Sequence, residues 1–147
     1  MQIIQNRKHT RLRARRGAAA VEFAVIAPLF FLLLGGIIEF GQAFRIQHAL
    51  STAARLGARA AVIEGSTSGQ VAQKVQDRCV RALGIASSDV RVDIAINGQA
   101  GGELSVAEEG AEISVTVSIP YSKAGVGFYA NTFANSTLSS CCILERE

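Results

Sequence analysis

Residues 23–38 read FAVIAPLFFLLLGGII, and this uncharged stretch decides how the chain is organised. Between Ala18 and Phe44, the only charged residues are Glu22 and Glu39. A transmembrane helix needs about 20 mainly apolar residues. The segment is therefore long enough to span a membrane.

The stretch before the apolar run is strongly basic. It holds six basic residues and no acidic one, namely Arg7, Lys8, Arg11, Arg13, Arg15 and Arg16. Because basic residues beside a span stay cytoplasmic, we expect a single-pass membrane protein with the N-terminus in the cytoplasm and the remainder outside. The whole chain has a net charge of +3, whereas residues 18–147 hold nine basic and twelve acidic groups, a net charge of −3. The basic cluster lacks interleaved aromatic residues, so no nucleic-acid partner is expected.

The helical pattern continues beyond the apolar run. Alanines dominate, and no turn signal appears until the Gly/Ser cluster at residues 65–69. We predict one nearly continuous helix over residues 18–64, with a membrane part of about 18–40 and an emergent part of about 41–64. At 1.5 Å per residue it would be about 70 Å long, so its second half must pack on an exported domain.

Residues 65–147 are predicted to form that small exported domain. Apolar residues at helical spacing between Val71 and Leu83, followed by Gly84, indicate a short capped helix. Residues 90–97 and 113–119 alternate with period two, which is typical of half-buried strands, and residues 137–144 read as a last strand. We expect residues 97–110 to be a mobile connection, too long for a tight hairpin, and residues 121–136 to be a packed loop. The predicted fold class is α+β, with a long N-terminal helix, a short helix and about three antiparallel strands.

The chain has three cysteines, so they cannot all pair within one chain. Cys79 lies on the apolar face of its predicted helix. Cys142 shares a face with Leu138 and Leu144, and Cys141 points the other way. In an exported domain a Cys79–Cys142 disulfide would add about 2–4 kcal/mol, and unpaired core thiols are the alternative that stays open.

Catalytic signatures are absent from the sequence. It contains no HExxH, GxSxG, P-loop or dinucleotide-binding turn, and His48 is the one histidine outside residues 1–17. We therefore expect no enzyme activity, no cofactor and no metal site.

Four stretches resemble the tight-adherence (Tad) pilus subunits, and specifically their TadE-like minor pseudopilins. They are RRGAAAVEF at 15–23, AP at 27–28, IEFG at 38–41 and AARLGAR at 53–59. The resemblance covers about a third of the chain, and the TadE and TadF types are not separated by it. It implies a basic leader of residues 1–17 that is removed by a prepilin peptidase after Gly17, which makes Ala18 the new N-terminus.

The same resemblance implies assembly roles for several residues. Glu22 takes the place of the glutamate at mature position five, and Phe23 stands where the major subunits have Tyr. Glu22 would meet the ammonium of Ala18, on its own helix or a neighbour's; the alternative is a headgroup-level charge. Glu39 is a candidate for subunit contact or a simple interfacial charge. Arg55 and Arg59, four apart on one helix face, would contact another pilus component or form a solvated face.

The predicted function is that of a TadE-like minor pseudopilin that takes part in assembly of a Tad/Flp-type adhesive pilus. The resemblance implies as partners the prepilin peptidase, other Tad pilins and pseudopilins, the inner-membrane assembly platform and membrane lipid. The alternative is a membrane-anchored exported binding or structural domain that is not processed as a pilin.

Overall fold

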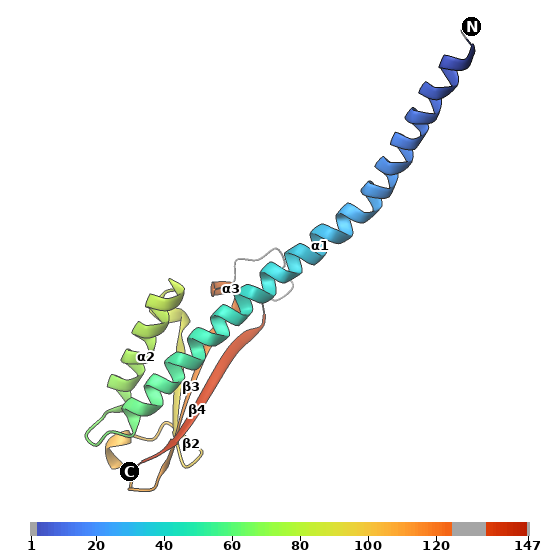
Figure 1. Cartoon of the computed structure of the whole chain (residues 1–147). Coiled ribbons are helices and arrows are strands. Elements are labelled where there is room, and N and C mark those ends of the chain that lie inside the picture. The colour runs from blue at the N-terminus through green and yellow to red at the C-terminus, as the bar shows by residue number, and fades with distance from the viewer. Residues whose placement is uncertain (1–2, 125–134, 147) are drawn as a thin grey trace. The chain divides into compact units, whose positions relative to one another are not determined.

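The chain divides into two units, Met1–Ile38 and Glu39–Glu147, and each is described by itself. The computed structural model describes residues 3–124 and 135–146. Helix α1 (Ile3–Ala61) contributes to both units (Figure 1). In the first unit, the described residues all belong to α1.

The first unit is a helix whose apolar side chains are bare. From Val21 to Ile38, the large apolar side chains are 41–71% exposed. The stretch Gly17–Ala61 contains an 18-residue window of mean hydropathy 2.4, and 6% of that window is buried. A core helix buries its apolar residues against a partner, whereas a membrane span exposes them to lipid. By length and composition, this is a helix able to cross a membrane.

In the second unit, α1 packs through its small and aliphatic residues. Its fully buried residues are Ile46, Leu50, Ala53, Ala54, Ala58 and Ala61. A Cβ added at Gly57 would lie 2.5 Å from Cγ2 of Val75 and 3.0 Å from Cγ1 of Val115. Glycine is therefore what lets α1 approach both a helix and a strand at this point.

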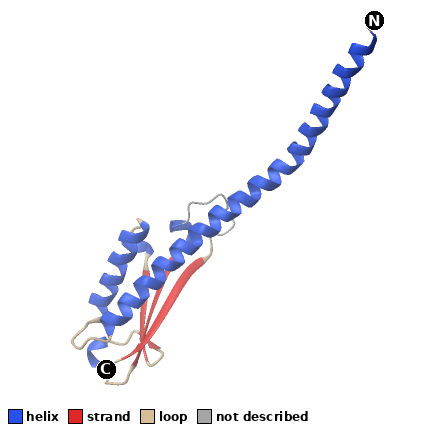
Figure 2. Ribbon diagram, viewed as in Figure 1, coloured by secondary structure: helices blue, strands red, loops and turns tan. Residues whose placement is uncertain are grey.

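The sheet has the order β2-β1-β3-β4 and is antiparallel throughout the described residues. Figure 2 shows its strands in red. Its strands are β1 (Arg91–Ile96), β2 (Gln99–Ala100), β3 (Glu112–Pro120) and β4 (Thr137–Glu145). In the register, Val115 lies opposite Ile94 on β1 and Cys142 on β4. The side chains of Ile113, Val115, Val117 and Ile119 are fully buried, so β3 carries the centre of the core.

Helix α2 (Ser68–Leu83) forms where the apolar spacing predicts it. The Thr67 hydroxyl accepts a hydrogen bond from the amide of Gln70 at 3.4 Å. Gly84 ends the helix at φ 70°, and its N–H donates to the carbonyl of Val80 at 2.8 Å. This left-handed cap suits glycine because it has no Cβ.

Two sequence-based expectations are wrong in detail. Asn97 and Gly98, at φ 50° and 78°, form a tight turn between β1 and β2, because this pair accepts the positive φ of a hairpin turn. A short 3₁₀ helix, η2 (Leu104–Val106), follows in the same connection, and another, η1 (Ser87–Asp89), precedes β1. Part of the predicted packed loop is helix α3 (Tyr121–Ala124), and residues 125–134 of that loop lie outside the described residues.

Candidate assembly site

The residues around the expected cleavage point lie on an open helix surface. Gly17 and Ala18 are exposed, and a Cβ added at Gly17 would meet no atom within 4 Å. Glu22 is exposed as well, and its carboxylate has no ion pair with any side chain that the structure describes. Phe23 is also exposed. The four predicted residues therefore share one bare stretch of α1.

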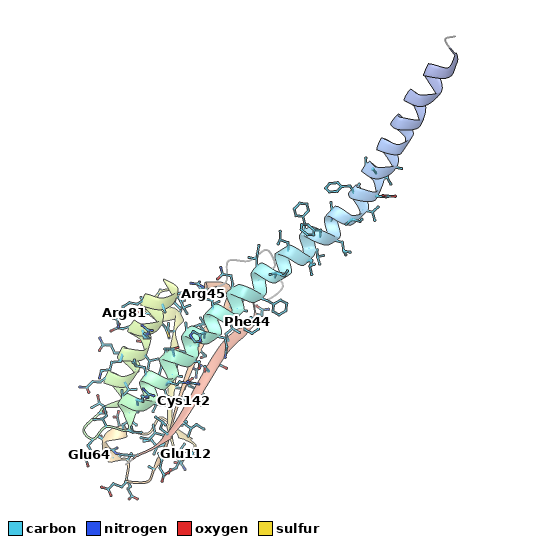
Figure 3. The ribbon with its side chains drawn as sticks, viewed as in Figure 1. Phe44, Arg45, Glu64, Arg81, Glu112 and Cys142 are labelled. Carbon is cyan, nitrogen blue, oxygen red and sulfur yellow. The ribbon has the colours of Figure 1, made fainter. Side chains whose placement is uncertain are left out.

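The apolar residues that follow are equally free of intramolecular packing. Figure 3 shows their side chains projecting outward from α1 on all visible sides. Exposed apolar area costs about 25 cal/mol per Å² in water. A helix with this surface is stable in lipid or against other apolar helices.

Glu39 is held inside the second unit, where it is 5% exposed. The hydroxyl of Tyr121 donates a hydrogen bond to its Oε1 atom at 2.5 Å. Its Oε2 atom is buried and has no hydrogen-bond partner among the described residues. Burial, the hydrogen bond to Glu39 and its negative charge together raise the pKa of Tyr121 to about 12. Glu39 is thus no freely solvated interfacial charge.

Arg55 and Arg59 lie together on the exposed face of α1, as their spacing predicts. With Thr52 and Leu56 they line a shallow groove on the helix surface. Leu56 is 44% exposed and is the apolar residue of this lining. Neither guanidinium forms an ion pair with a side chain in the part of the chain that the structure describes.

These residues lie in a stretch that resembles a known family. Residues 17–59 match the family model described as TadE-like protein. The chain carries a TadE-like segment. It begins at Gly17 and ends at Arg59, so it contains every residue to which an assembly role was assigned above. Neither a curated protein nor a solved structure matches the sequence.

The TadE-like segment associates this protein with Tad pilus systems and their components. An N-terminal apolar helix fits a single-pass membrane protein of such a system. Within the segment, the large apolar side chains of α1 are exposed as far as Ile38, whereas most apolar side chains from Ile46 onward are buried in the core. The sheet itself lies outside the match.

Outside the TadE-like segment, the cysteines occupy three different environments. Cys79 is buried, Cys142 is half-buried and Cys141 is exposed, and all three carry free thiols in the structure. Burial raises the pKa of Cys79, and Arg78 partly opposes this. Cys79 and Cys142 border the same hydrophobic core, and a disulfide between them stays a prediction.

Two structural residues were not found from the sequence. Tyr121 follows the strand-ending Pro120, and nothing in the sequence links it to Glu39. Arg146 is buried, and its guanidinium donates to the carbonyl of Leu104 at 2.5 Å. An arginine after a strand ordinarily reads as a solvated charge.

Metal binding has no support in the described residues, because they contain no group of three or more His, Cys, Asp or Glu side chains able to hold an ion. The chemistry that the TadE-like segment offers is apolar surface and isolated charges. Both are suited to contacts between helices.

Proposed function

We propose that the chain is a minor pseudopilin that is cut after Gly17 by a prepilin peptidase and takes part in assembling a Tad/Flp-type adhesive pilus. One observation carries the proposal: the TadE-like match begins at Gly17, directly after Arg16, the last of six basic residues, and just before the apolar run. Its role is structural rather than catalytic. Its partners are the peptidase, other Tad pilins and pseudopilins, and the assembly platform of the inner membrane.

The proposed mechanism is helix-on-helix assembly. Cleavage would free the ammonium of Ala18 four residues before Glu22, which is the spacing of neighbours on one helix face. A carboxylate in lipid is costly, and an ammonium on the same or a neighbouring helix offsets that cost. Such a pair would fix the register between neighbouring subunits.

A second function, that of an unprocessed anchor for an exported binding domain, fits the same exposed helix. It differs in one observable: the anchor keeps its basic leader.

The N-terminal sequence of the protein recovered from membranes tests the processing step. In cells with the peptidase, the chain should begin at Ala18, and without it at Met1. Gly17→Val should keep the leader, because the branched side chain crowds the backbone to be cut. Gly41→Val is the matched control, since Gly41 is also an open position of α1, and this variant should be cut normally. Met1 retained in peptidase-positive cells would exclude processing.

Replacing Glu22 tests the assembly step separately. We expect Glu22→Ala to be cut normally but recovered in sheared pili at a level at least about tenfold lower than the wild type. The substitution leaves the ammonium of Ala18 unpaired, and an unpaired charge in an apolar environment costs several kcal/mol. Glu64→Ala, at an exposed position beyond the end of α1, is the control and should assemble as the wild type does. Equal recovery of the two variants would remove Glu22 from the mechanism.

A further inference from the structure

The second unit carries two exposed surfaces of opposite charge, each built around one apolar side chain. The first is the groove lined by Thr52, Arg55, Leu56 and Arg59, called the basic groove below. The second is a turn of the connection between β2 and β3. Its exposed residues include Glu103, Val106, Glu108 and Glu109, called the acidic ridge below.

The two surfaces match in pattern as well as in sign. In the basic groove, the half-exposed Leu56 lies beside two cations that have no ion pair within the described residues. On the acidic ridge, Val106 is 77% exposed, and the three glutamates around it are likewise without an ion pair there. Each surface therefore has an exposed apolar side chain near charged groups, and the sign of the charge is opposite on the two surfaces.

Hydrogen bonds with Ser68 and Arg146 fix the backbone of the acidic ridge. Leu104 is fully buried, and its amide donates to the hydroxyl of Ser68, which itself donates to the carbonyl of Gly102 at 3.1 Å. The buried guanidinium of Arg146 donates to the carbonyl of Leu104. A preorganised surface loses little conformational entropy on binding, which suits a contact face.

We infer that the basic groove of one copy binds the acidic ridge of a second copy. Because the two surfaces differ, the contact is head-to-tail, and a pair of subunits keeps one free groove and one free ridge. Such heterologous contacts generate rings or open filaments rather than closed dimers. The inference rests on the proposed function, since it supplies that assembly with a contact outside the apolar helix.

Photo-crosslinking of the full chain in membranes tests this contact. A benzoylphenylalanine in place of Leu56 should form adducts with residues 103–109 of a second, differently tagged copy, identified by peptide mass spectrometry. The same probe in place of Gln73, on the exposed face of α2, is the position control and should give no such adduct.

Charge reversal then tests the pairing. Arg55→Glu/Arg59→Glu should lower the adduct yield about tenfold, and so should Glu108→Arg/Glu109→Arg, because exposed ion pairs are weak singly and several add up. A groove-reversed copy carrying the probe, together with a ridge-reversed copy, should restore the yield. Lys74→Glu/Arg78→Glu, two exposed cations four residues apart on α2, is the matched control and should change nothing.

The outcomes separate the contact from the processing. Adducts that map to another protein or within one chain, or a mixed pair of reversed copies that fails to restore the yield, would overturn the inference. The N-terminal residue is determined on the same membranes. Crosslinks between copies that keep Met1 would support the contact while excluding the processing, and a normal Ala18 start without crosslinks would do the reverse.

Discussion

Glu39 and Tyr121 lie 82 positions apart in the chain and share a short hydrogen bond. The pair joins α1 to the short helix that follows β3, at the point where the second unit begins. A buried carboxylate with one unsatisfied oxygen is costly, so Tyr121 supplies the partner that makes Glu39 tolerable there.

Removing the phenol hydroxyl should therefore destabilise the second unit. We expect Tyr121→Phe to lower the free energy of unfolding by about 1–3 kcal/mol at neutral pH, because both oxygens of Glu39 then lack a partner. Urea unfolding of the full chain in detergent micelles, followed by circular dichroism, measures the difference. An unchanged midpoint would show that the hydrogen bond contributes nothing to stability.

The same pair predicts a dependence on alkaline pH. The pKa of Tyr121 is about 12 in the folded chain, against 10 for an ordinary tyrosine. The native state then holds this proton more tightly than the unfolded state, so the stabilisation is complete below pH 10 and is lost between about pH 10 and 12. Tyr121→Phe should lack this loss, and the two stability curves should converge toward pH 12. Glu39→Gln removes the negative charge beside Tyr121. Its stability should begin to fall at the same pH as that of the wild type, and the total loss should be smaller.

The cysteines should differ in reactivity because the thiolate is the reactive form. Cys141 is exposed, whereas Cys79 is buried with a raised pKa. We expect iodoacetamide to alkylate Cys141 at least about tenfold faster than Cys79 at pH 8. Mass spectrometry of timed samples measures both rates, and urea-unfolded protein, in which the rates should be equal, is the control.

In exported protein that has not been reduced, complete protection of Cys79 and Cys142 with a mass lower by two hydrogens would establish the predicted disulfide; free labelling of Cys142 would exclude it.

At the scale of elements, α1 passes close to both α2 and β3 at Gly57. A methyl group there meets the branched side chains of Val75 and Val115, which are fully buried and cannot move aside freely. We expect Gly57→Ala to lower the free energy of unfolding by about 1–3 kcal/mol, as other overpacked cores do. This should happen although alanine favours helix over glycine by about 1 kcal/mol.

Gly41→Ala provides the matched comparison on the same helix, since nothing lies within 4 Å of its added Cβ. That variant should be as stable as the wild type or slightly more stable in urea unfolding. If both substitutions shifted the midpoint equally, helix propensity rather than packing would explain the effect at Gly57.

Most elements could be predicted from the sequence because their patterns are local. The period-two alternation before Pro120 gives β3, the apolar spacing between Val71 and Cys79 gives α2, and the uncharged run gives the bare part of α1. The two-residue strand β2 was missed because the acidic connection was read as one piece, although Asn97-Gly98 alone favours a tight turn.

The residues that join distant elements could not be predicted in this way. The partner of Glu39 and the burial of Arg146 depend on which elements meet in three dimensions, and no spacing along the chain encodes that. Of the candidate site, the sequence located the exposed residues Gly17 to Phe23 and the arginine pair, whose exposure follows from helix periodicity. The small apolar centres beside the charges, Leu56 and Val106, became apparent only from their exposure.

At the scale of the whole molecule, most of the large apolar side chains that are exposed belong to the apolar run of α1, where a membrane can cover them. Leu29 and Leu33 on α1 and Ile143 on β4 are all more than half exposed. Only the first two belong to the uncharged run. Lysine at the centre of a membrane span costs about 2.5–3.5 kcal/mol, whereas on a solvated strand it costs little.

We therefore expect Leu29→Lys/Leu33→Lys to shift the chain from the membrane pellet to the soluble fraction after an alkaline carbonate wash. Ile143→Lys, which charges an exposed apolar residue of the sheet, should remain in the pellet with the wild type. Immunoblots of the two fractions measure the distribution. Retention of the doubly substituted chain would show that lipid does not cover this part of the helix.

Strand β4 follows every other described strand in chain order, yet it pairs with β3 along its whole length, from Glu112 opposite Glu145 to Pro120 opposite Thr137. If the N-terminus stays cytoplasmic, as the basic residues before the span indicate, the part after the span crosses the membrane in chain order, and β3 emerges with one edge unpaired. An unpaired strand of alternating Ile and Val readily joins foreign strands. In that order of export, the sheet is complete only after its last strand has been translocated, and until then the free edge of β3 is open to pairing with other chains.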